Sequence, residues 1–293
     1  MVLLIRKLTR LALCGLLISF LSACSSLSGF LFYPHEGHYQ TPERLGVNYQ
    51  TVHLESEGFK LENWLLEPKP ELIVKGTVLY LHGNGENIST HMNSVAWLTL
   101  QGYQVFLLDY RGYGHSEGAS TLRSALYDIY QAHSWLSTNT SGPIVLFGQS
   151  MGGALAITYA ANLDSLEDTN LTPIQALITE SAPADWPQVA REAMRKHWLT
   201  WLIQIPASLI ESKYNPEDHI DKLRDIPILL MHSQQDPIVS YEHFEQLVDA
   251  AEDAGLSIQT YQTLGGHTQG LAYEQARQRF LEFIERAIES SSH

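Results

Sequence analysis

The sequence predicts an α/β domain in which helices cover both faces of a mostly parallel sheet. Short apolar segments alternate with longer segments in which apolar residues recur every three or four positions. Several short segments are apolar at successive positions, as strands buried on both faces are. Packing helices on both sides of a parallel sheet buries both kinds of segment, so this architecture is expected.

Eight segments have the pattern of strands, and the turn Ser56-Glu57-Gly58 joins the first two into an expected antiparallel hairpin at one edge. The predicted strands are 49–54, 61–66, 77–82, 103–109, 144–148, 176–180, 227–232 and 258–261. Five segments have helical periodicity, at 87–100, 122–136, 151–162, 241–254 and 273–288. The helices separate most of the later strands, which is why a mostly parallel eight-stranded sheet is predicted.

Residues 181–222 form an insert between the sixth and seventh strands. Its amphipathic composition fits a small helical lid over an apolar pocket, and it fits equally the packing of a cap onto the core. The residues that suggest a lid are Trp186, Met194, Trp198, Trp201, Leu202 and Ile205. A lid of this kind would favour acyl chains as the groups that contact the pocket.

The N-terminus has the pattern of a targeting segment. Three cations precede the apolar run 11–21, which suits a signal-peptide core and is short for a membrane span. The run ends in Leu21-Ser22-Ala23-Cys24, which resembles a bacterial lipobox and implies cleavage before Cys24 and lipidation of its sulfur. We therefore expect a signal peptide at 1–23, a lipidated tether at 24–31 and the α/β domain at 32–293. An ordinary secretory signal and an uncleaved anchor are the alternatives.

This resemblance predicts a lipoprotein of the bacterial cell envelope, held at a membrane through Cys24. Ser25 follows the cysteine where an aspartate would favour the inner membrane, so an outer-membrane protein facing the periplasm is expected. The chain has only one cysteine besides Cys24, Cys14 in the signal core, so no disulfide is expected in the domain. Its 18 Lys and Arg against 32 Asp and Glu give a net charge of −14, which argues against nucleic-acid binding.

The segment Gly148-Gln149-Ser150-Met151-Gly152-Gly153 follows a predicted strand and opens a predicted helix. Such a sharp turn pushes the serine hydroxyl out at the top of a sheet, and its glycines relieve crowding. Ser150 is therefore the candidate nucleophile. Further along the chain, Asp236 follows the seventh strand and His267 follows the last, in the order acid then base. Glu180, at the end of the sixth strand, is the reserve candidate for the acid.

The stretch His82-Gly83-Asn84-Gly85 follows the third strand. It lacks the Lys-Ser/Thr of a phosphate-binding P-loop, so an oxyanion hole is the better interpretation, formed by the backbone N–H groups of Asn84 and Met151. His82 is expected to brace this loop. Asp109 and Arg111 in the segment 109–118 are expected to form an ion pair that braces a second loop, and His115 is expected to be an ordinary loop residue.

No cofactor or metal is expected. The cluster His35, Glu36 and His38 contains metal-ligand residue types, but it lacks the helical H-E-x-x-H spacing and lies in chain that should be extended. The combined motifs, with HGN at 82–84, DYRGYGHSEG at 109–118, GQSMGG at 148–153 and GGH at 265–267, resemble the α/β-hydrolase superfamily. More narrowly they resemble exported esterase- and lipase-like hydrolases of the serine aminopeptidase-like and depalmitoylase-related group.

The resemblance, which covers roughly 32–284, implies a membrane-anchored serine hydrolase with Ser150, Asp236 and His267 as its catalytic residues. The expected partner is a small-molecule ester, thioester or other acyl substrate. A serine peptidase or amidase of the same fold is one alternative. A non-catalytic lipoprotein that uses the hydrolase fold for binding is another.

Overall fold

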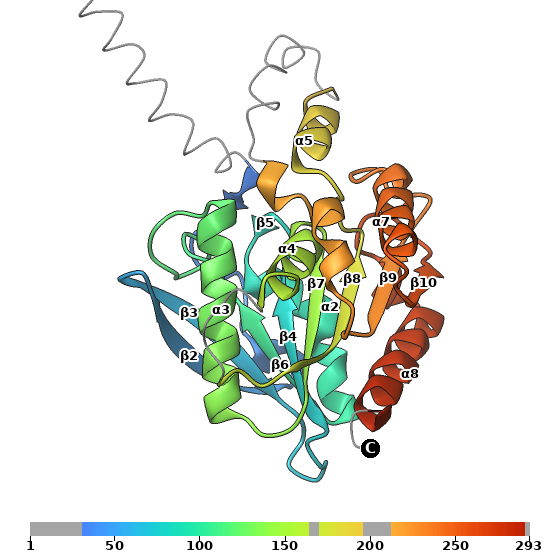
Figure 1. Cartoon of the computed structure of the whole chain (residues 1–293). Helices are drawn as coiled ribbons and strands as arrows, with labels where there is room; N and C mark the ends of the chain where they lie inside the picture. The colour runs from blue at the N-terminus through green and yellow to red at the C-terminus, as the bar shows by residue number, and fades with distance from the viewer. Residues whose placement is uncertain (1–30, 164–169, 196–211, 291–293) are drawn as a thin grey trace, which may run out of the picture.

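The computed structural model describes residues 31–163, 170–195 and 212–290. The predicted signal peptide and Cys24 lie outside these residues. Within them the eight predicted strands form one sheet, in the order β10-β9-β8-β7-β4-β6-β3-β2 (Figure 1). The strands are β2 (Asn48–Ser56), β3 (Phe59–Glu67), β4 (Gly76–Leu81), β6 (Tyr103–Leu108), β7 (Ile144–Gln149), β8 (Ile174–Glu180), β9 (Ile228–His232) and β10 (Ile258–Gln262).

The predicted edge hairpin is confirmed, because β2 pairs antiparallel with β3 from Asn48 opposite Glu67 to Ser56 opposite Phe59. β3 is also antiparallel to β6, whereas every pairing from β6 to β10 is parallel. The central strands β4 and β7 are buried along their whole length. A strand covered on both faces must be apolar on both, which explains the unbroken apolar runs that predicted them.

Helices cover both faces of the sheet, and each face has its own core (Figure 1). One core takes residues from α3 (Leu122–Asn139), α4 (Met151–Ala160) and α7 (Tyr241–Asp253). The other takes residues from α2 (Ile88–Val95) and α8 (Glu274–Ser290). The predicted helix at 87–100 is divided, because α2 passes into a 3₁₀ helix, Ala96–Gln101, that ends at the left-handed Gly102.

A second, two-stranded sheet was not predicted. Tyr33–Pro34 (β1) pairs in parallel with Gly85–Glu86 (β5), and the Tyr33 N–H donates to Asn84 O at 2.8 Å. Two-residue strands are too short to show periodicity, so only the fold could reveal them. Their pairing fastens the start of the domain to the loop that follows β4.

The insert is described in part. It contains α5 (Trp186–Arg195) and three short 3₁₀ helices, Ser212–Tyr214, Pro216–Asp218 and Ile220–Lys222. Trp186 packs into the core with 2% of its surface exposed, and its indole N–H donates to Tyr214 O at 2.8 Å. This residue therefore belongs to the packed cap. Trp198, Trp201, Leu202, Ile205 and the side chain of Met194 lie outside the described residues, so the lid stays a prediction.

Candidate active site

Ser150 lies on a sharp turn between the end of β7 and the start of α4. Its φ of 54° and ψ of −123° lie outside the usual conformations of a residue with a side chain. Glycines make the turn possible. A Cβ at Gly148 would lie 2.2 Å from Gly152 O, and one at Gly152 would lie 2.1 Å from Leu81 O. The turn places Ser150 at the carboxyl edge of the sheet, next to the end of β4.

His267 links Ser150 to Asp236. Its Nε2 lies 2.8 Å from Ser150 Oγ, and its Nδ1 lies 2.8 Å from Asp236 Oδ2. Asp236 follows β9 and His267 follows β10, so neighbouring parallel strands deliver both residues to the edge where Ser150 lies. With the Nδ1–H group donating to the carboxylate, Nε2 is free to accept the hydroxyl proton of Ser150.

The Asp236 carboxylate is held in its ionised form. Burial acts to raise its pKa, but the hydrogen bond and charge of His267 and the N–H of Ile238 outweigh burial and lower the pKa to about 2. Oδ1 accepts from the N–H groups of Ile238 at 2.8 Å and Val239 at 3.0 Å. The side chain is fully buried, so its orientation toward His267 is fixed.

Glu180, the reserve candidate for the acid, has other partners. Its Oε1 accepts from the Gly270 N–H at 2.7 Å, and its Oε2 accepts from Gln149 Nε2 at 2.6 Å. Burial of the whole side chain raises its pKa. Glu180 therefore ties the chain after His267 to the end of β7, and Asp236 is the carboxylate that contacts the imidazole.

The loop 82–86 lies directly against Ser150, because a Cβ built on Gly83 would be 3.5 Å from the Cβ of Ser150. Met151 is the first residue of α4, so its N–H has no partner within the helix. A second loop, the one after β6, also contacts the loop 82–86, since the hydroxyl of Tyr113 donates to Asn84 O at 2.7 Å. The loop that contains Asn84 therefore lies next to Ser150, and Met151 follows the serine directly at the start of α4.

Two histidines brace this loop, one of them missed by the sequence analysis. His82, expected to be structural, donates from Nδ1 to Gly83 O at 2.7 Å. His91 of α2 stacks on His82 at 5.1 Å between ring centroids and donates from Nε2 to Gly85 O at 2.9 Å. Burial and then the neighbouring His82 lower the pKa of His91 to about 4, so His91 is neutral. A lone histidine on a predicted helix gave no signal of this contact.

The prediction that Asp109 and Arg111 form an ion pair is wrong. Arg111 Nη2 lies 2.7 Å from Asp128 Oδ1 on α3, and its Nη1 lies 2.9 Å from Glu57 Oε2 in the edge hairpin. Asp109 instead faces histidines, with Oδ1 lying 3.2 Å from His82 Nε2. The residues are two apart on a turning loop, so their side chains face different neighbours and each braces a different part of the structure.

Comparison with known proteins agrees with this architecture. The family model described as serine aminopeptidase S33 matches residues 73–221, about half of the chain. The uncharacterized protein YfhR of Escherichia coli K12 is 30% identical over 204 residues, which are 67% of this chain and 66% of YfhR. The lysophosphatidylserine lipase ABHD12 of Macaca fascicularis is 27% identical over 190 residues, 60% of this chain and 46% of that protein.

Two solved structures show the same fold. The Pyrococcus furiosus esterase Pf2001 superposes with a TM-score of 0.70 at 22% identity, covering 88% of this chain and 98% of the esterase. An α/β hydrolase from Vibrio vulnificus gives a TM-score of 0.66 at 20% identity, with 80% of each chain covered. The parallel sheet, the serine turn after β7 and these matches together establish that this chain is an α/β hydrolase of the serine aminopeptidase S33 family.

Proposed function

We propose that this hydrolase cleaves carboxylic esters or thioesters through an acyl-enzyme on Ser150. One observation carries the proposal: the continuous chain from Ser150 Oγ to His267 Nε2 and from His267 Nδ1 to Asp236 Oδ2, with 2.8 Å at each link. A nucleophile, a base and an orienting acid in hydrogen-bond contact are the minimum that acyl transfer to a serine requires.

In the first half of the reaction, Ser150 Oγ attacks the carbonyl carbon of the substrate while His267 Nε2 takes the hydroxyl proton. Asp236 stabilises the imidazolium that forms and keeps Nδ1 protonated. The N–H groups of Asn84 and Met151 would donate to the carbonyl oxygen as it becomes an oxyanion, and one such donor is typically worth about 3 kcal/mol in the transition state.

Collapse of this intermediate breaks the bond to the leaving alcohol or thiol, which takes its proton from His267. Water then attacks the acyl-enzyme, with His267 Nε2 accepting a proton from the water and returning it to Ser150 Oγ. The products are a carboxylic acid and an alcohol or thiol.

An ester or thioester is proposed as the substrate on two grounds. The relatives include a protein named as a lysophosphatidylserine lipase and a fold neighbour named as an esterase. An aminopeptidase also needs an acidic clamp for a free amine, and the sequence offered no candidate for one. The family description, serine aminopeptidase, favours peptides or amides as a second candidate substrate class.

The test is labelling of the full chain with a fluorophosphonate, followed by assays on p-nitrophenyl esters of increasing chain length and on aminoacyl p-nitroanilides. We expect labelling of the wild type, none of Ser150→Ala, and a fall in ester turnover of at least about 10³-fold in that variant. Faster cleavage of the anilides would identify a peptidase. Absence of labelling in folded wild-type protein would favour a binding module.

We further propose that Cys24 carries acyl chains that hold the domain at a membrane of the cell envelope. The support is the sequence at 21–24, since Cys24 lies outside the described residues. Across the described ranges, no helix has the length and apolarity needed to cross a bilayer. Lipid chains buried in the bilayer would supply the attachment, because an acidic domain is repelled by anionic headgroups.

A further inference from the structure

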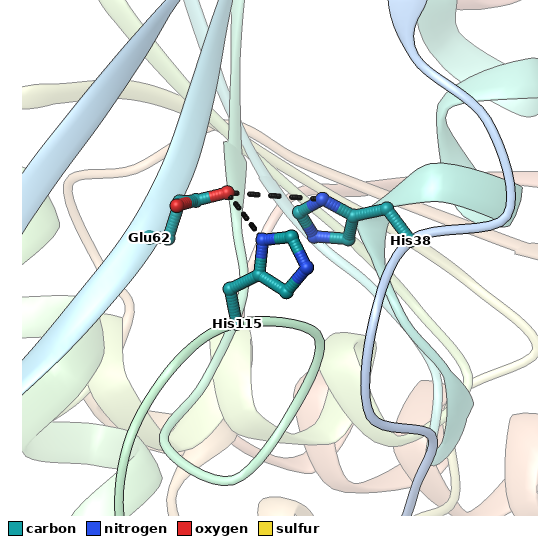
Figure 2. A group of neighbouring side chains, drawn as sticks. All are labelled: His38, Glu62 and His115. Atoms are coloured by element: carbon teal, nitrogen blue, oxygen red, sulfur yellow. Dashed lines mark hydrogen bonds and ion pairs between the residues drawn. The ribbon is translucent and has the colours of Figure 1, made fainter.

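Three chain segments that are far apart in the sequence bring two histidines and a glutamate together, on residues that the proposed reaction does not use (Figure 2). His38 precedes β2, Glu62 lies on β3, and His115 lies in the loop after β6. Glu62 Oε1 is 2.9 Å from His115 Nδ1 and 3.7 Å from His38 Nδ1. One donor atom from each of the three residues falls within 4.8 Å of the others.

We propose that His38, Glu62 and His115 bind a Zn²⁺ ion. Two imidazole nitrogens with one carboxylate oxygen suit zinc, whereas Mg²⁺ and Ca²⁺ prefer oxygen ligands alone. Zinc bonds of about 2.1 Å in a tetrahedron place ligand atoms about 3.4 Å apart. The distances of 2.9 and 3.7 Å from Glu62 Oε1 to the two histidines lie on either side of this value, and all three donor atoms lie within 4.8 Å of one another. Side-chain rotations would bring them to the spacing of a zinc site.

The site would keep one position for water. The His115 side chain is 52% exposed and that of Glu62 is 22% exposed, whereas His38 is 7% exposed. Three protein ligands, of which His115 is exposed, leave the fourth corner of a zinc tetrahedron for a water molecule. Zinc can therefore enter without any movement of the core.

A second carboxylate supports His38 from behind. Its Nε2 lies 3.5 Å from Asp109 Oδ2, which is fully buried. A histidine that binds a metal through one ring nitrogen commonly donates from the other to a carboxylate, and this contact orients the ring. Gly114 makes room for the contact, because a Cβ there would lie 2.1 Å from Asp109 Oδ2 and 2.6 Å from His38 Nε2.

The backbone holds the three segments in place before any ion binds. The Gly37 N–H donates to Gly114 O at 2.9 Å, and the Gly114 N–H donates to His35 O at 3.0 Å. On the strand side, the Glu62 N–H donates to Ser116 Oγ at 3.0 Å. Ligands fixed in this way lose little conformational freedom on binding, which favours affinity.

The sequence analysis considered His35, Glu36 and His38 as metal ligands, and only His38 belongs to the proposed zinc site. His38 contributes, but its partners come from β3 and from the loop after β6, so no local spacing could reveal them. The ion would join the start of the domain to both elements. By orienting His38, the zinc ion would also hold the Asp109 side chain in place. Asp109 Oδ1 lies 3.2 Å from Nε2 of His82, the first residue of the loop 82–86.

The test is calorimetric titration of the metal-free full chain with ZnCl₂, together with thermal unfolding in its presence. We expect the wild type to bind one more Zn²⁺ than His115→Asn and to gain thermal stability that this variant does not gain. Because His115 is half-exposed, its replacement should leave the fold intact. Glu62→Gln, which keeps the shape of the side chain, should weaken binding at least about 10-fold.

Two controls separate this site from other histidines. His219→Asn removes a part-exposed histidine beside α4 and should bind zinc like the wild type. His267→Ala removes the histidine of the candidate active site and should also retain the ion. The proposal is overturned if His115→Asn binds as much zinc as the wild type, or if binding is lost in His267→Ala and kept in His115→Asn.

Discussion

Asp236 and Glu180 show how two buried carboxylates at one edge of a sheet come to have different roles. Asp236 presents one oxygen to His267 and has its pKa lowered to about 2. Glu180 uses both oxygens to accept from Gly270 and Gln149, and burial raises its pKa. The difference arises from partners supplied by other segments, because the two residue types are equivalent in acid–base chemistry.

Replacing each carboxylate by its amide should separate these roles. Asp236→Asn should lower kcat about 10⁴-fold with little change in thermal stability, because the amide favours the wrong tautomer of His267. In Glu180→Gln, the new amide N–H would face one of the two groups that donate to Glu180, the N–H of Gly270 or Nε2 of Gln149. Two donors in contact cannot form a hydrogen bond, so the free energy of unfolding should fall by about 1–3 kcal/mol. The folded Glu180→Gln protein should retain turnover within about 10-fold. Steady-state kinetics and thermal unfolding of both variants check this, and the opposite pattern would reassign the acid.

His91 contributes to the pH dependence of stability. Its pKa in the folded state is about 4, because of burial and the neighbouring His82. An unfolded histidine titrates near 6.5. As the pH falls from about 6.5 to 4, the unfolded chain binds a proton that the folded chain does not, so the free energy of unfolding falls across this window.

His91→Gln should weaken this pH dependence while its amide still donates to Gly85 O. The free energy of unfolding of the wild type should fall between pH 6.5 and 4 by about 1–3 kcal/mol more than that of the variant. Urea unfolding at both pH values measures the difference. Equal losses in both proteins would show that His91 titrates normally in the folded state.

At the scale of elements, the serine turn depends on how closely α4 approaches β4. A Cβ at Gly152 would lie 2.1 Å from Leu81 O and 2.6 Å from His82 O. Both contacts are with backbone atoms, which cannot rotate away as a side chain can. The first turn of α4 would have to move away from the sheet to accept any side chain at this position.

Gly152→Ala should therefore destabilise the protein by about 3 kcal/mol, at the upper end of the range for overpacking, and displace Ser150 from His267. Gly85→Ala is the matched control, since a Cβ there meets nothing within 4 Å. Its stability should stay within about 1 kcal/mol of the wild type. Chemical denaturation measures both variants, and equal stabilities would contradict the proposed close packing.

At the scale of the whole molecule, strand order explains why residues between 82 and 267 form one site. Strands β4, β7, β8, β9 and β10 run in parallel, so their carboxyl ends open at one edge. Ligand sites in such sheets lie outside these ends. The cluster of His38, Glu62 and His115 involves β3 and the loop after β6, toward the antiparallel end of the sheet.

The proposed anchor makes a prediction about the complete chain in its cell. Cells supplied with radiolabelled palmitate should label the wild type and Cys14→Ser, but not Cys24→Ala. Label on a single cysteine would explain membrane attachment through buried acyl chains. If the wild type takes up no label and stays in the aqueous phase of a detergent phase partition, the segment 1–23 is an ordinary secretory signal.

The sequence by itself determined the sheet and the candidate triad. The eight strands were predicted from short apolar segments, which are unbroken in central strands such as β4 and β7 because both faces of these strands are buried. Ser150 was predicted because a strand, a glycine turn and a helix follow one another locally. Asp236 and His267 were predicted because each follows a strand, and parallel strands end at one edge. Such signals depend on neighbours in the chain.

The tertiary structure decided what depends on distant segments. It gave Arg111 its partners Asp128 and Glu57 in place of Asp109, and it placed His91 against the loop 82–86. It gave the reserve candidate Glu180 the partners Gly270 and Gln149, and it brought His38 next to Glu62 and His115. These contacts are fixed by how strands and loops pack in space, and a polar residue far along the chain leaves no periodic pattern that could predict them.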